Sequence, residues 1–159
     1  MTLALEYAEK ALARGEFPVG CLMVYNGEVV AGGGRLSSRD NINELDHAEI
    51  VALRFLLKNN NKINFADITV YSTMEPCLMC FSTLLVNGIR KVVFGYEDVM
   101  GGGTNLSVVG LPPLYSRLDP QIIGGVLRLQ CLELFKNFFS NSENIYLKGS
   151  YLATYTLAQ

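Results

Sequence analysis

Two short segments carry residues whose types and spacing suit the binding of a metal ion and the movement of protons beside it. The first contains His47, the only histidine of the chain, and Glu49; the second contains Cys77 and Cys80. A catalytic zinc ion takes three protein ligands and leaves its fourth position to water. We therefore predict a Zn²⁺ site in which His47 supplies a ring nitrogen, Cys77 and Cys80 supply thiolates, and Glu49 is the catalytic acid and base.

The order of these residues matches the H-x-E … P-C-x-x-C signature of zinc-dependent nucleobase deaminases. Zinc lowers the pKa of its bound water from ~15.7 toward ~7, so that a hydroxide nucleophile exists at neutral pH. Its target would be an amino-bearing ring carbon, such as C4 of cytosine or C6 of adenine. Glu49 would carry the proton first to a ring nitrogen and then to the departing amine, so that ammonia leaves and a carbonyl remains.

Each part of this signature has a second interpretation when it is taken alone. Glu49 follows Asp46 by three residues, so these side chains could instead form a capping box at a helix start. The Cys-x-x-Cys pair could be a redox pair or half of a structural zinc site. A closed structural site needs a fourth ligand, for which the candidates are Cys21 and Cys131. The sequence contains no second Cys-x-x-Cys and no further histidine, which favours the open arrangement.

The segments that carry the candidate ligands are predicted to begin helices. A strand over 67–73, rich in β-branched residues, leads into a helix over 77–87 with Pro76 in its first turn. Asp46 is the candidate N-cap of a helix over 47–58. Because the partial positive charge of a helix N-terminus favours thiolates, we expect zinc to lie between two helix starts.

The rest of the chain alternates helices and strands. The further predicted elements are helices over 3–14 and 120–137, strands over 19–25, 28–31 and 91–96, and loops over 32–45 and 101–113. Asn26-Gly27 predicts a tight hairpin between the first two strands. A strand, a helix and a strand in succession imply parallel pairing through a right-handed crossover. The expected fold class is α/β, a three-layer α/β/α sandwich with a mixed five-stranded sheet.

Composition is typical of one compact domain over 1–159, with a poorly defined tail over 140–159. Half of the residues are hydrophobic and 18% are charged. No stretch reaches the roughly 18 to 20 apolar residues of a membrane span, and the first residues lack the basic region of a signal peptide. Four cysteines suit a reducing, cytoplasmic location, with Cys21 and Cys131 as buried packing residues.

The chain resembles the cytidine deaminase-like superfamily, and within it the bacterial tRNA adenosine deaminase type. The resemblance extends over about 3–139 and is carried by segments 17–20, 24–30, 47–54, 73–80, 89–95 and 125–139. It implies the zinc ligands and the proton-carrying glutamate assigned above, and a homodimer.

The same resemblance implies a set of substrate-binding residues. The backbone near Ala48 and Cys77 would polarise the base, and Phe17, Met74 and Pro76 would line its pocket. For Phe17 and Met74, ordinary core packing is the alternative.

Two departures from the family pattern concern the substrate side of the site. The family usually has an asparagine after the hairpin that contacts the substrate, and the aligned residue here is Leu36, which has no donor or acceptor. Asn41 or Asn43 in the same loop could replace it. The usual Asp-Pro-Thr-Ala before the first ligand is replaced by residues 43–46, Asn-Glu-Leu-Asp, which places acidic groups near the cavity mouth.

Charge and the C-terminal segment are a further point of difference. The chain has 13 basic and 15 acidic residues and a pI near 5.4, whereas RNA binding draws on basic surface. Arg35, Arg39 and Arg54 could form a small basic patch. Residues 145–157 are tyrosine-rich with one lysine, and they could pair as an edge strand or cover a partner subunit.

The predicted function is zinc-dependent hydrolytic deamination of a nucleobase, nucleoside or nucleotide. The first alternative is a tRNA adenosine deaminase acting on the wobble base, A to I. The second is a non-catalytic zinc-binding module for RNA or a protein partner, in which Glu49 would have no purpose. The sequence does not select among adenine, guanine and cytosine.

Overall fold

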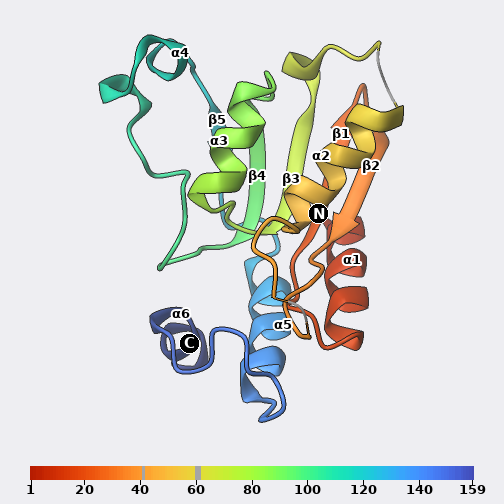
Figure 1. Cartoon of the computed structure of the whole chain (residues 1–159), viewed down its shortest axis with the longest axis vertical. Coiled ribbons are helices and arrows are strands. Elements are labelled where there is room, and N and C mark those ends of the chain that lie inside the picture. Colours follow the sequence, from red (N-terminus) through yellow and green to blue (C-terminus); the bar gives the residue numbers. More distant parts are fainter. Residues whose placement is uncertain (41, 60–61) are drawn as a thin grey trace.

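A mixed five-stranded sheet in the order β2-β1-β3-β4-β5 forms the centre of the molecule (Figure 1). The computed structural model describes residues 1–40, 42–59 and 62–159. The strands are β1 (Gly20–Tyr25), β2 (Glu28–Gly34), β3 (Thr69–Met74), β4 (Lys91–Tyr96) and β5 (Gln121–Ile123). β1 pairs antiparallel with β2 and β3, and β4 pairs parallel with β3 and β5. The predicted mixed sheet is therefore confirmed.

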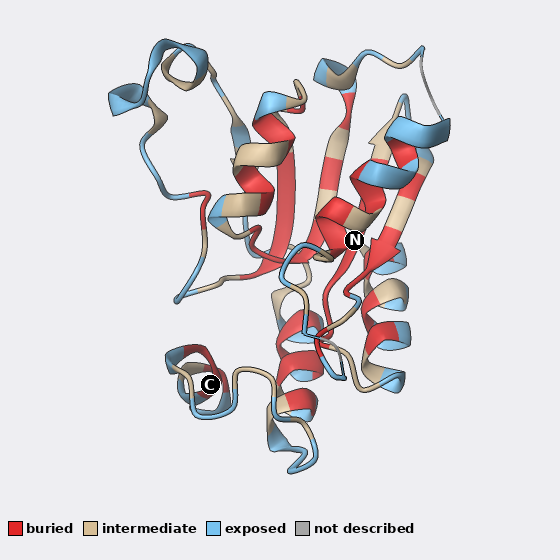
Figure 2. Ribbon diagram, in the orientation of Figure 1, coloured by how far each residue is buried: buried red, intermediate tan, exposed pale blue. Residues whose placement is uncertain are grey.

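Helices cover both faces of this sheet, with α2 and α3 on one face and α1 and α5 on the other (Figures 1 and 2). The helices are α1 (Thr2–Ala13), α2 (Ala48–Asn59), α3 (Leu78–Val86), α4 (Pro113–Ser116), α5 (Arg128–Ser140) and α6 (Tyr151–Leu157), with short 3-10 turns η1 (Phe65–Asp67) and η2 (Val108–Gly110). Figure 2 shows buried and exposed residues along different sides of α1 and α2. The arrangement is the expected three-layer sandwich.

The glycines of β2 allow helices to pack closely on its two sides. A Cβ atom on Gly33 would lie 2.8 Å from Val51 Cγ1 in α2, and one on Gly34 would lie 2.9 Å from the Tyr7 carbonyl oxygen in α1. Successive residues of a strand face opposite sides of the sheet, so these two contacts belong to different layers. The glycines were expected in a loop, but they extend the predicted strand over 28–31 to Gly34.

The hairpin between β1 and β2 forms as predicted. Asn26 and Gly27 both have positive φ angles, 50° and 84°. A two-residue turn with this backbone matches the right-handed twist of the strands that it joins. It sets β1 beside β2, and the chain leaves β2 at Gly34 toward the first candidate ligand.

The C-terminal region differs from the prediction. The expected helix over 120–137 is wrong at its start, because residues 121–123 form β5 beside β4 and the helix begins only at Arg128. Two isoleucines favour a strand here, and Gly125, with a φ angle of 80°, interrupts a helix before Arg128. The tail was predicted either to pair as an edge strand or to cover a partner subunit, and the first of these alternatives is wrong. Residues 151–157 form α6, whose start is capped by Ser150 Oγ accepting the Ala153 N–H.

The hydrophobic core is one cluster that reaches from the sheet into the tail. It includes Phe17, Tyr96 and Phe135 and extends to Leu152 of α6. Cys21 and Cys131 are fully buried, as expected. Within the described residues, no helix is long and apolar enough to cross a membrane.

Candidate active site

Two helix starts bring the three predicted metal ligands together. His47 directly precedes α2, Cys77 is the N-cap residue of α3, and Cys80 lies in the first turn of that helix. Their ligand atoms, one ring nitrogen and two sulfurs, all lie within 4.8 Å of one another. Pro76 lies just before the N-cap rather than in the first turn. The predicted position of the donors, between two helix N-termini, is the position that the structure has.

The spacing of these donors fits a zinc ion. The distance between Cys77 Sγ and His47 Nδ1 is 3.5 Å. A tetrahedral zinc ion with Zn–S of about 2.3 Å and Zn–N of about 2.0 Å holds a sulfur and a nitrogen at about this separation. Among the residues that the structure describes, neither Cys21 nor Cys131 joins the group. The donor set is therefore that of an open site with three protein ligands, and the closed structural site is not supported.

The two cysteines differ in their readiness to lose a proton. A hydrogen bond with the Cys80 thiol lowers the pKa of Cys77 to about 4, although burial opposes this shift. The same hydrogen bond, together with burial, raises the pKa of Cys80. Burial lowers the pKa of His47, but the contact with Cys77 and the Glu49 charge outweigh it, so the net shift is upward. Metal binding must therefore displace a proton from Cys80.

Glu49 lies in the first turn of α2 with only 3% of its surface exposed. Its Oε1 accepts a hydrogen bond of 3.1 Å from Ser72 Oγ on β3, and burial raises its pKa. A carboxyl group with a raised pKa can accept and return protons closer to neutral pH. The alternative capping role is not supported, because the Asp46 carboxylate is bound by Asn43 Nδ2 at 2.7 Å and Arg54 Nη1 at 2.8 Å. The N-cap position of α2 belongs to His47.

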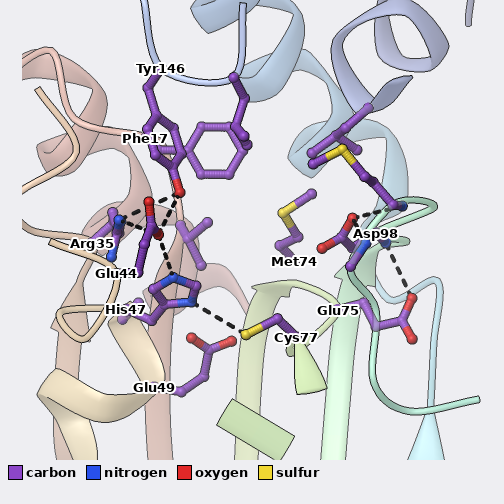
Figure 3. A pocket seen from close by; sticks show the side chains of 16 residues that line it. Phe17, Arg35, Glu44, His47, Glu49, Met74, Glu75, Cys77, Asp98 and Tyr146 are labelled. Carbon is purple, nitrogen blue, oxygen red and sulfur yellow. Dashed lines mark hydrogen bonds and ion pairs between the residues drawn. The ribbon is translucent and has the colours of Figure 1, made fainter. Parts of the chain in front are cut away.

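A cavity of about 260 Å³ opens beside the donors (Figure 3). Sites for drug-sized ligands usually measure about 300–1,000 Å³, so this one suits a single small ring system. The residues that line it come from several separate segments of the chain and are Phe17, Val19, Arg35, Glu44, His47, Ala48, Glu49, Met74, Glu75, Cys77, Asp98, Met100, Gly101, Tyr146, Leu147 and Leu152.

Three of the four predicted substrate-binding residues line this cavity. They are Phe17, Ala48 and Met74. Phe17 also packs against Phe135 in the core, with 5.3 Å between ring centroids, so it lies both in the core and at the cavity wall. Pro76 is not among the lining residues; its carbonyl oxygen accepts the Gly103 N–H at 2.9 Å.

The loop after β2 meets the cavity through a residue that the sequence did not single out for this role. Leu36 is 40% exposed and does not line the cavity, whereas the preceding residue, Arg35, is 2% exposed and does. Asn43 hydrogen-bonds to Asp46 rather than facing the cavity, and Asn41 lies outside the described residues. The guanidinium of Arg35, one residue before Leu36, thus forms part of the cavity wall.

Glu44 is one of the acidic residues predicted near the cavity mouth. Its Oε2 atom has three neighbours. Arg35 Nη2 donates to it at 3.1 Å, Tyr146 Oη donates at 2.9 Å, and His47 Nε2 lies 3.2 Å away. Tyr146 comes from the tail, 102 residues after Glu44. No local motif marks this tyrosine, so sequence reasoning missed its role.

The three arginines that could form a basic patch each lie beside an acidic residue. Arg35 pairs with Glu44 at 3.1 Å, Arg39 Nε lies 3.5 Å from Asp40, and Arg54 pairs with Asp46. Each of these three guanidinium groups therefore has a carboxylate neighbour.

Glu75 fixes the loop on the far side of the cavity. It is 4% exposed, and its carboxylate accepts hydrogen bonds from the backbone N–H groups of Asp98 and Thr104, both at 3.2 Å. Gly103 lets this loop approach α3, because a Cβ atom there would lie 2.7 Å from Leu78 Cα. Asp98 lines the cavity, and burial raises its pKa. The glycine run at 101–103 thus allows close packing beside the candidate metal ligands.

Comparisons with known proteins agree with this geometry. The profile of the cytidine and deoxycytidylate deaminase zinc-binding region matches residues 1–96. The tRNA-specific adenosine deaminase 2 of Xenopus tropicalis is 38% identical over 147 residues, covering 87% of this chain and 86% of that protein. The tRNA-specific adenosine deaminase of Haemophilus influenzae is 34% identical over 139 residues, covering 87% of this chain and 80% of that protein.

Solved structures show the same fold. A tRNA:A34 deaminase studied for A-to-I editing at the wobble position superposes with a TM-score of 0.73 and 29% identity, covering 84% of this chain and 96% of that one. The guanine deaminase of Nitrosomonas europaea superposes with a TM-score of 0.68 at 17% identity, covering 86% of this chain and 81% of that one. The second likeness concerns the fold alone.

Proposed function

We propose a substrate and a set of residue roles for this chain, which belongs to the cytidine and deoxycytidylate deaminase zinc-binding family and is a zinc-dependent hydrolytic deaminase. The proposed reaction removes the amino group from C6 of an adenine base. The observation that carries it is the combination of three clustered metal donors with a buried glutamate at the wall of a small cavity.

The proposed zinc ligands are His47 Nδ1, Cys77 Sγ and Cys80 Sγ. Bound zinc supplies a Lewis acid that makes a water nucleophilic at neutral pH. Glu49 is the proposed proton carrier, because it is buried, faces the cavity and is held in place by Ser72. The proposed base-binding wall consists of Phe17, Met74 and the backbone near Ala48 and Cys77, while Pro76 is left with a supporting role in the loop before α3.

Adenosine in tRNA is the proposed substrate. The support is the similarity to relatives named tRNA-specific adenosine deaminases, at 34–38% identity over most of both chains. A base in a folded tRNA must leave its stack to reach a zinc site, and a cavity for a single ring system suits a flipped base.

A free base, nucleoside or nucleotide is the second candidate substrate. Two observations favour it. The chain has 15 acidic and 13 basic residues, and its cavity-side arginine is already paired with a carboxylate. Tyr146, Leu147 and Leu152 of the tail form part of the cavity wall, which leaves less room for a large substrate beside the base.

Ammonium release over a substrate panel separates these candidates. The panel contains an unmodified tRNA pool and adenine, guanine and cytosine as bases, nucleosides and monophosphates. The proposal predicts release from the tRNA pool with conversion of adenosine to inosine. Release from one small molecule with none from tRNA would establish the second candidate, and release from a cytosine compound alone would contradict the assignment of adenine.

The proposal has three further parts. They are a homodimer, a cytoplasmic location and one folded unit over 1–159. Leu78 and Val86 on the outer side of α3 are 53% and 54% exposed, which supports an apolar contact there. All four cysteines are free, which supports a reducing compartment. Sedimentation should give about twice the 17.5 kDa of one chain, and a value near 17.5 kDa would contradict the dimer.

A further inference from the structure

We propose that Glu44 is a positioning residue of the metal centre, which fixes the His47 ring with Nδ1 toward the two cysteines and links that ring to the C-terminal tail. The inference rests on the proposed role of His47 as a metal ligand. It goes beyond that role because it adds a residue outside the zinc signature and a segment about 100 residues away.

The first observation concerns the two nitrogens of one ring. His47 Nε2 lies 3.2 Å from Glu44 Oε2, and His47 Nδ1 lies 3.5 Å from Cys77 Sγ. An ionised carboxylate only accepts hydrogen bonds, so the Nε2 atom beside it carries the ring proton. In the neutral ring this leaves a lone pair on Nδ1, which a metal ligand needs. Figure 3 shows the ring between Glu44 on one side and Cys77 on the other.

The second observation is that Glu44 itself is held in place. Its side chain is 58% exposed, and a free glutamate at such a position would sample many rotamers. Arg35 Nη2 and Tyr146 Oη both donate to the oxygen that faces His47, at 3.1 and 2.9 Å. The guanidinium carbon of Arg35 also lies 5.4 Å from the centre of the Tyr146 ring. These contacts select the Glu44 rotamer that reaches the histidine.

The third observation concerns the anchoring of Tyr146. Its ring centroid lies 5.4 Å from that of Phe17, a core residue at the cavity wall. The tail that carries it continues into α6, where Leu152 is 1% exposed. A continuous path of contacts therefore runs from the core through Tyr146 and Glu44 to His47. Carboxylates that accept a hydrogen bond from a metal-bound histidine orient the ring and increase its basicity, and their loss typically costs 10–100-fold in metal affinity.

Zinc affinity provides the first test. Competition with a chromophoric chelator should show about 10–100-fold weaker zinc binding in Glu44→Ala than in the wild-type chain. Glu44→Gln retains an oxygen that can accept from Nε2–H and should recover most of that loss. Glu28→Ala is the matched control, because it removes an exposed glutamate at the opposite end of β2 and should bind zinc like the wild type. Equal affinity in Glu44→Ala and the wild type would overturn the proposal.

The single histidine allows a second test that does not depend on activity or on affinity. In the NMR spectrum of a chain labelled with ¹⁵N-histidine, every ring signal belongs to His47. The zinc-loaded wild type should show a protonated Nε2 whose hydrogen exchanges slowly with water. That hydrogen should exchange faster in Glu44→Ala and, to a smaller extent, in Tyr146→Phe. Unchanged exchange in Tyr146→Phe would overturn the link to the tail, and unchanged exchange in Glu44→Ala would overturn the positioning role of Glu44.

The response of the wild-type histidine signals to zinc shows whether the positioning role of Glu44 or the proposed metal site itself is wrong. If zinc leaves the wild-type histidine signals unchanged, His47 is not a ligand and the proposed site itself is wrong. If the wild-type signals respond to zinc while the Glu44 variants match the wild type in affinity and exchange, only the positioning role fails. Metal-free samples of each variant, checked for their unfolding midpoint, show whether a weakened affinity comes from a damaged fold.

Discussion

The cavity has two walls of different origin. One is made by residues around the starts of α2 and α3, where His47, Glu49 and Cys77 lie within two short motifs. The other includes Tyr146 and Leu152 of the C-terminal tail. Residue type and spacing specify the chemistry of the first wall, whereas the second takes part only because the chain folds back over the site.

This difference indicates how the two walls can vary. Zinc ligation and proton transfer restrict the first wall to a few side chains in a fixed geometry. The second wall needs shape and a few hydrogen bonds, which many sequences supply. Substrate preference can therefore change in the tail while the reaction stays the same. In this chain the tail over 145–157 carries one lysine and no arginine.

Removing a cysteine from the first wall should have the largest effect, and removing a buried cysteine of the core is its control. Cys80→Ala removes a proposed ligand and should abolish stoichiometric zinc binding together with deaminase activity, since a site with two remaining ligands holds zinc poorly. Cys131→Ala removes an equally buried thiol of α5 and should retain one zinc per chain. Metal analysis after gel filtration measures both. Stoichiometric zinc in Cys80→Ala would remove that cysteine from the ligand set.

Leu152→Ala should weaken the fold while leaving the metal centre in place. The side chain is 1% exposed and belongs to the core cluster, so its truncation should lower the free energy of unfolding by about 2–5 kcal/mol. Chemical denaturation of the metal-free protein measures this loss, and zinc content should remain stoichiometric. A loss below about 1 kcal/mol would mean that α6 contributes little to the core.

The attachment of α6 should also depend on pH through Glu97. Its carboxylate accepts from Arg128 Nε and from Tyr155 Oη, both at 2.8 Å. Burial raises the pKa of Glu97, but the hydrogen bond from Arg128 and its other partners outweigh burial, so the pKa lies below its ordinary value of 4.5. The contribution of this group to stability is therefore present above pH 4.5 and lost as the pH falls through the lower pKa of the folded state.

Glu97→Gln measures that contribution. At pH 7 the variant should be less stable than the wild type by about 1–2 kcal/mol, because the pair is partly exposed to solvent. The difference should narrow as the pH falls below 4.5. Unfolding curves at a series of pH values give the comparison. A difference that stays constant down to pH 3 would show that the charge of Glu97 is not what holds the tail.

The same contrast explains which parts of the structure the sequence predicted. His47, Cys77 and Cys80 could be placed together because strand and helix patterns put them at helix starts that a parallel crossover brings to one edge. The strand at 121–123 was missed because three residues give little periodicity, and the apolar spacing of α5 was extended backward over it. Arg35 and Tyr146 were missed because their partners are defined only by tertiary contacts.

The proposed deaminase activity depends on proton transfer by Glu49, and Glu49→Gln tests this role directly. The variant keeps the size of the side chain and all three proposed zinc ligands. With zinc at one per chain in both proteins, deamination of the best substrate of the panel should fall about 10²–10⁴-fold in the variant. Equal turnover in the two proteins would contradict the role of Glu49. Zinc binding without turnover in the wild type, on any member of the panel, would instead indicate a non-catalytic zinc module.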